Sequence, residues 1–117
     1  MKVKDLIKKL EAEVINEADF GREVTSVYCC DLLSWVMGRA PSDCAWLTVM
    51  GNMNAVAVSV LADISVIILA ENAACDQPAI SKAIEQGVNV LKTSLPAFEA
   101  GLIVHELLGA GVPLRKN

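Results

Sequence analysis

The feature that most constrains the fold is a long uncharged stretch from Cys44 to Ala62, which polar residues interrupt at its centre. Its length reaches the roughly 18 residues of a membrane-spanning helix. Gly51, Asn52 and Asn54 break the stretch, however, and Asp63 closes it. Such breaks are costly in a bilayer, so we expect a buried strand, a turn and a helix, and no membrane association.

Strand-like and helix-like segments alternate along the rest of the chain. β-branched or wholly apolar runs predict strands at residues 22–30, 44–50, 65–70 and 88–93. An amphipathic pattern at Val3, Leu6, Ile7 and Leu10 predicts an opening helix. Further helices are expected at residues 32–37, 54–64, 78–86 and 94–109.

Capping and turn residues mark the predicted helix ends. Asp31 and Asp76 are placed to cap the helices that follow them, and Gly38 and Gly87 to end those helices. Pro96 falls in the first turn of the last helix, which the glycines and proline at 109, 111 and 113 prevent from continuing. In the segment 54–64, alternating valines would also suit a strand, but a two-residue hairpin there would lack its usual glycine.

This order of elements predicts an α/β fold, a three-layer α/β/α sandwich with a largely parallel sheet. The short apolar segment 13–16 is expected to belong to a hairpin-like opening before the parallel strands. A length of 117 residues is typical of one domain, so residues 1–117 are expected to form it.

Charge and cysteine usage narrow the functional classes. The net charge is −4 and no basic run stands out, which argues against nucleic-acid or anionic-membrane partners. The N-terminus has no signal-peptide pattern, so a cytoplasmic location is expected, with reduced thiols. The chain has four cysteines, none in a C-x-x-C pair; we expect small buried hydrophobes at positions 29, 30, 44 and 75, and no metal site.

The candidate site lies where the parallel strands end, because ligands of such sheets bind beyond the carboxyl ends of the strands. The stretches at Cys30–Asp31, Met50–Asn54, Ala70–Asn72 and Thr93–Ser94 should meet at this edge. Amides at the start of the helix after Gly51 could be satisfied by Asn52 or Asn54, or could bind an anionic ligand. The candidate ligand-binding residues are Asp31, Gly51, Asn52, Met53, Asn54, Glu71, Asn72, Thr93 and Ser94.

No pattern of catalytic residues emerges. The chain has neither a phosphate-binding loop nor a glycine fingerprint after a strand, and its one histidine, His105, is expected on a helix. We therefore expect no enzymatic activity and identify no cofactor. A kinase, a thiol-dependent enzyme and an iron–sulfur protein remain as alternative hypotheses.

Residues 22–72 and 93–109 resemble the DRTGG domain, most closely its free-standing members from anaerobes, which are often encoded beside iron hydrogenase. Met53-Asn54 and the segment "TSLPAFE" at 93–99 match this branch. The family's Asp-Arg pair falls on Asn52-Met53 and its Thr-Gly-Gly on Ala70–Asn72, so neither motif is kept. Its fold is similar to the N-terminal domain of HPr kinase/phosphorylase.

The resemblance implies a non-catalytic regulatory or protein-interaction module in anaerobic redox or fermentative metabolism. It implies a homodimer that senses a small molecule, with a hydrogenase or electron-transfer protein as a partner. Other family members are fused to CBS domains in regulated pyrophosphatases, which suggests an adenine-nucleotide sensor as the alternative.

Overall fold

The computed structural model describes residues 1–109. In this part of the chain one sheet has the strand order β1-β5-β4-β3-β2. The strands are β1 (Glu13–Asn16), β2 (Ser26–Cys29), β3 (Cys44–Thr48), β4 (Val66–Leu69) and β5 (Val90–Lys92). The helices are the 3-10 turn η1 (Val3–Asp5), α1 (Leu6–Lys9), α2 (Leu33–Arg39), α3 (Met53–Leu61), α4 (Gln77–Gln86) and α5 (Ala97–Leu108).

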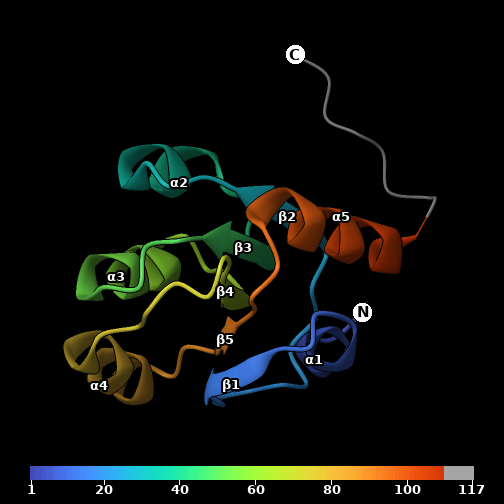
Figure 1. The fold of residues 1–117 in the computed structure, drawn as a ribbon. Helices are drawn as coiled ribbons and strands as arrows, with labels where there is room; N and C mark the ends of the chain where they lie inside the picture. The colour runs from blue at the N-terminus through green and yellow to red at the C-terminus, as the bar shows by residue number, and fades with distance from the viewer. Residues whose placement is uncertain (110–117) are drawn as a thin grey trace.

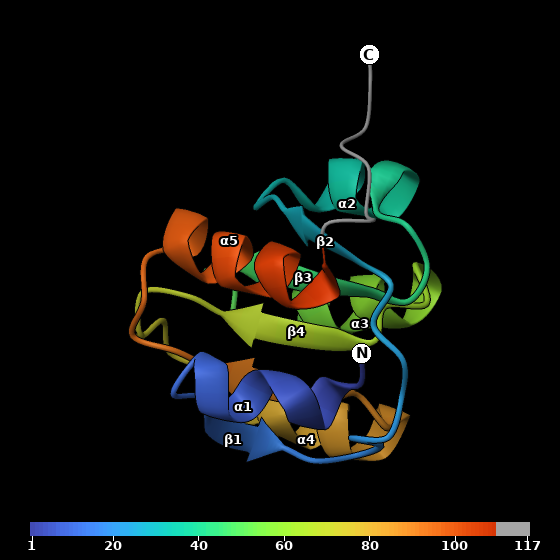
Figure 2. The same cartoon turned by 90° about the vertical axis from the view of Figure 1, so that its right-hand side faces the viewer.

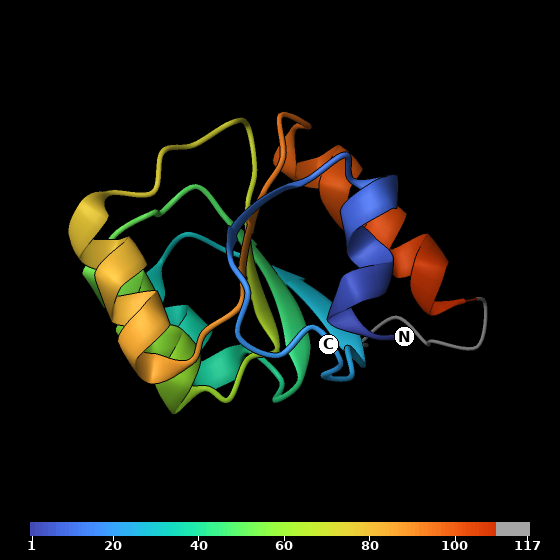
Figure 3. The same cartoon turned by 90° about the horizontal axis from the view of Figure 1, so that it is seen from below.

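Two helical layers enclose the sheet (Figure 1; Figure 3, seen from below). Helices α2, α3 and α4 cover one face, and α1 and α5 cover the other. The predicted three-layer α/β/α sandwich is therefore confirmed. No helix within residues 1–109 is long and apolar enough to cross a membrane.

The sheet is parallel from β2 to β5, as predicted, with Tyr28 opposite Trp46 and Trp46 opposite Ile67. The expected hairpin-like opening is wrong, because β1 pairs antiparallel with β5 at the far edge. The buried Asn89 side chain explains this placement: its Oδ1 accepts hydrogen bonds from the backbone N–H groups of Ala18 and Asp19. These bonds hold the segment after β1 beside β5.

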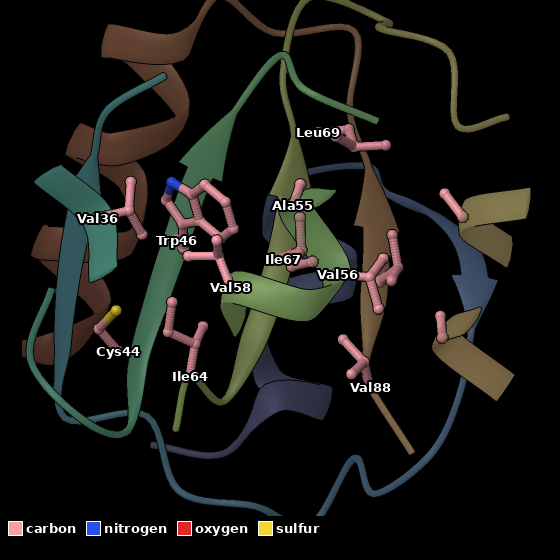
Figure 4. Close-up of a cluster of buried hydrophobic side chains, with 13 residues drawn as sticks. Val36, Cys44, Trp46, Ala55, Val56, Val58, Ile64, Ile67, Leu69 and Val88 are labelled. Carbon is pink, nitrogen blue, oxygen red and sulfur yellow. The ribbon is translucent and has the colours of Figure 1, made fainter. Parts of the chain in front are cut away.

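The core beneath α2, α3 and α4 is built on β3 and β4, all of whose side chains are buried. Figure 4 shows Trp46 and Ile67 among small and β-branched side chains from α2 and α3. The indole Nε1 of Trp46 donates to the backbone oxygen of Cys30 at 2.9 Å, so its one polar group is satisfied. Small residues such as Ala55 and Ala79 let α3 and α4 lie close on the sheet.

Helices α3 and α4 confirm the sequence predictions. The Asn52 and Asp76 side chains accept from the N–H groups of Ala55 and Ala79, and Gly87 ends α4 in a left-handed conformation with φ of 69°.

Other helix ends were predicted wrongly, and α3 ends at Leu61, before the predicted end at residue 64. Helix α2 continues through Gly38 to Arg39 and stops because Ala40 precedes Pro41, which favours an extended backbone. Pro96 is the N-cap of α5 and lies just outside its first turn. The proposed helix breakers Gly111 and Pro113 lie outside the described residues.

Candidate functional site

The carboxyl ends of β2, β3, β4 and β5 lie along one rim of the sheet, because these strands are parallel and adjacent. Loops from neighbouring strands are hydrogen-bonded across this rim. Ala70 N–H bonds to the Thr48 oxygen at 3.0 Å, and Asn72 N–H to the Thr93 oxygen at 2.9 Å. The four stretches singled out in the sequence thus share one edge.

Asp31 links the ends of β2 and β3. Its carboxylate accepts from the Thr48 hydroxyl at 2.7 Å and from the Val49 N–H at 3.0 Å. The prediction that Asp31 caps α2 is therefore wrong, since Leu32 occupies the N-cap position without a side-chain cap. A carboxylate that already accepts two hydrogen bonds has reduced capacity to bind a further ligand.

Gly51 is required by a close backbone approach. A Cβ at this position would lie 1.9 Å from the Ala74 oxygen. The Gly51 oxygen also accepts from the Asp76 N–H at 3.0 Å. These two contacts join the loop after β3 to the loop before α4.

The Asn52 side chain satisfies one of the backbone amides at the start of α3. Its Oδ1 accepts from the Ala55 N–H at 3.0 Å, so the cap consumes one of the donors that an anion would need. Met53 and Asn54 are exposed on the first turn. The first turn of α3 is therefore a capped helix start with a structural role. Only its exposed side chains, Met53 and Asn54, are accessible to a ligand.

Glu71 and Asn72 both have left-handed backbones, with φ of 57° and 56°. Their N–H groups bond to the oxygens of Leu95 and Thr93 at 2.9 Å, which ties the loop after β4 to the loop after β5. Glycine adopts this conformation without strain, whereas this chain adopts it here with two residues that carry side chains.

Thr93 and Ser94 differ in their surroundings. Thr93 is buried, and its hydroxyl donates to the Leu10 oxygen at 2.7 Å and accepts from the Leu95 N–H at 3.3 Å. Ser94 is exposed. Thr93 therefore anchors the end of α1 to the rim, whereas Ser94 can reach solvent.

The rim encloses little volume. Beside Gly51 and Asn52 lies an apolar hollow of about 10 Å³, which would hold at most one water molecule. Neither Asp31, Asn54, Asn72 nor Ser94 lines it. A ligand larger than a water molecule therefore could not enter this hollow, and on the surface of the rim it would meet the exposed carboxylates of Asp31, Glu71 and Asp76.

A larger cavity, of about 180 Å³, lies at the opposite edge, beside the amino ends of β4 and β5. Sequence analysis did not anticipate it. Arg22 lines this cavity and donates to the carboxylates of Asp43 at 2.9 Å and Asp63 at 2.8 Å. Asn89 also lines it and makes four hydrogen bonds with the protein. These groups chiefly hold the segment before β2 to the sheet.

The thiols of Cys29 and Cys44 are poor nucleophiles. Burial raises the pKa of the Cys44 thiol to about 12, and burial together with the charge of Asp31 raises that of Cys29. Of the cysteines, only Cys44 is fully buried, so the expectation of four buried thiols was too broad. Within residues 1–109, no group of three or more His, Cys, Asp or Glu side chains could hold a metal ion.

Exposed apolar side chains flank the edge strand β2. Figure 1 shows β2 at one end of the row of strands, with α2 and α5 on either side. We call this the β2-edge face and define it by Cys29 and four large exposed side chains: Leu32, Trp35, Phe98 and Leu102. Large side chains exposed together in this way often mark an interaction surface.

Comparison with known proteins shows a likeness to a solved structure. No protein-family model and no curated protein matches the chain. A crystal structure of the CBS and DRTGG domains of the regulatory region of Clostridium perfringens pyrophosphatase, complexed with the activator diadenosine tetraphosphate, is similar with a TM-score of 0.72. The sequences are 14% identical, and the match covers 99% of this chain and 51% of the solved one. The present chain thus spans about half of that solved chain, and the similarity supports a DRTGG-like domain at the level of the fold.

Proposed function

We propose that residues 1–117 form a DRTGG-like domain of the free-standing type, acting as a non-catalytic regulatory and protein-interaction module. The observation that carries this proposal is the group of exposed apolar side chains on the β2-edge face. The fold that bears this face is similar to that of the pyrophosphatase regulatory region. Two further observations support a non-catalytic role: the hollow beside Gly51 and Asn52 is very small, and the side-chain oxygens of Asp31, Asn52 and Thr93 are already hydrogen-bonded within the protein.

The module acts as a homodimer in this proposal. The setting inferred from the resemblance is the cytoplasm of an anaerobe, where the dimer would bind a small molecule and a hydrogenase or electron-transfer protein. Light scattering on the purified chain tests the first step. We expect a mass near twice 12.5 kDa at micromolar concentration. A mass of 12.5 kDa up to several hundred micromolar would refute the homodimer.

A second candidate function is an adenine-nucleotide sensor, favoured by the diadenosine tetraphosphate complex of the similar pyrophosphatase region. The carboxylates of Asp31, Glu71 and Asp76 oppose a polyphosphate at the rim of this chain. Thermal unfolding with and without the nucleotide distinguishes the two functions. A ligand at 100 times its Kd stabilises by about 2.7 kcal/mol, which corresponds to roughly 10 °C in Tm. An unchanged Tm at millimolar nucleotide would exclude the sensor.

A further inference from the structure

The two edges of the sheet are protected to different degrees. Strand β1 carries the exposed Glu13 and a register shift between Val14 and Asn16, and both features discourage pairing with another chain. Strand β2, from Ser26 to Cys29, has no charged residue and keeps a regular register with β3. The β2 edge therefore lacks the charge and the register shift that protect β1, although it is short.

Helix α5 turns apolar side chains toward this unprotected edge. Its buried residues include Gly101, where a Cβ would lie 3.0 Å from Cys29 Sγ, so α5 lies directly against β2. Ile103, on one flank of the helix, packs into the core shared with α1. Phe98 and Leu102, four residues apart, occupy the opposite flank. Phe98 is 78% exposed, which is unusual for so large an apolar side chain.

Helix α2 supplies the other side of the face. Figure 2 shows α2 just beyond β2, at the end of the molecule farthest from β1. Trp35 is 48% exposed, and the Arg39 guanidinium lies 3.9 Å from its ring centroid. Leu32 is about as exposed. The cation–π contact holds the indole in place while leaving much of its surface in solvent.

We propose that a second copy of this chain covers the β2-edge face, with α2 of each copy lying against α5 of the other. This inference rests on the homodimer of the proposed function and identifies its interface. A half-exposed large side chain presents roughly 100 Å². The four side chains then contribute about 800 Å² over two copies, compared with the roughly 1,000 Å² at which specific interfaces begin. Neighbouring atoms and the edge of β2 add to this area.

The charges on the two helices favour this arrangement. Helix α2 carries Arg39 at its end, and α5 carries the exposed carboxylates of Glu99 and Glu106. Pairing α2 with α5 brings opposite charges together, whereas pairing α5 with α5 would bring carboxylates together. A two-fold axis makes the same α2–α5 contact twice, as a closed symmetric dimer requires.

Sedimentation velocity over a concentration series tests the interface with matched variants. We expect Phe98→Glu and Trp35→Glu each to raise the dimer Kd at least 30-fold. The control Ile84→Glu, at a 65% exposed position on α4, should leave Kd unchanged. Circular dichroism melting checks that each variant is folded; because both positions are exposed, unfolding is not expected.

The possible outcomes distinguish a failure of this interface from a failure of the proposed homodimer. A monomeric wild-type chain overturns the homodimer and this interface with it. If the wild-type chain is a dimer and neither Phe98→Glu nor Trp35→Glu raises the dimer Kd, only the proposed interface is overturned. Arg39→Glu should weaken the dimer, and adding Glu99→Lys and Glu106→Lys should restore it. A dimer that Arg39→Glu leaves unchanged overturns the pairing of α2 with α5.

Discussion

Replacing Gly51 by alanine tests the rim most sharply. The added Cβ would lie 1.9 Å from the Ala74 oxygen and 2.9 Å from Cys75 Cα, so the backbone of one loop must move. Overpacking of this kind costs about 1–3 kcal/mol. Moving the loop also strains the bond from Asp76 N–H to the Gly51 oxygen, worth about 1 kcal/mol. We expect the free energy of unfolding to fall by about 3 kcal/mol.

Chemical denaturation measures this change, and a Tm about 12 °C lower should accompany it. Gly38→Ala is the matched control, since no atom lies within 4 Å of its added Cβ and Gly38 is inside α2. An alanine there should stabilise the protein by about 0.5–1 kcal/mol. If Gly51→Ala costs less than about 0.5 kcal/mol, the loops at the rim are not packed as described.

Three further substitutions test individual contacts. Asp31→Ala should lower the free energy of unfolding by about 1–2 kcal/mol, because it leaves the Thr48 hydroxyl and Val49 N–H without their partner; an unchanged urea midpoint would contradict this. Glu71→Gly should stabilise by about 0.5 kcal/mol by relieving the left-handed backbone, whereas a loss of stability would show that the side chain contributes more than the strain costs. Because the raised pKa of Cys44 keeps its thiol neutral in the folded state, stability should be lost as the pH rises above 9, where the unfolded thiol ionises, up to about 12. Cys44→Val should remove part of this alkaline loss, and identical pH profiles for the two proteins would refute the linkage.

Local patterns in the sequence predicted most of the layers. The wholly apolar run at 65–70 and the capping residues Asn52 and Asp76 are signals that depend only on near neighbours, and the structure contains the corresponding elements. The partner of β1 could not be predicted in this way. It depends on Asn89, about seventy residues along the chain from the amides of Ala18 and Asp19.

Side-chain roles at the rim were harder to predict for the same reason. Asp31 has a favourable position for capping α2, but its carboxylate reaches the end of β3 instead. The need for a glycine at position 51 could be anticipated from the turn, whereas its cause, the Ala74 carbonyl, lies on another loop. The cavity beside Arg22 had no local signal, since Asp43 and Asp63 approach it only in the folded chain.

Hydrogen–deuterium exchange at two protein concentrations tests the central claim, that a second copy covers the β2-edge face. It locates buried backbone without any substitution. On dilution below the dimer Kd, we expect amides of α2, β2 and the exposed flank of α5 to exchange faster, while α3 and α4 keep their rates. Exchange that is independent of concentration, or faster exchange confined to α3 and α4, would contradict the account.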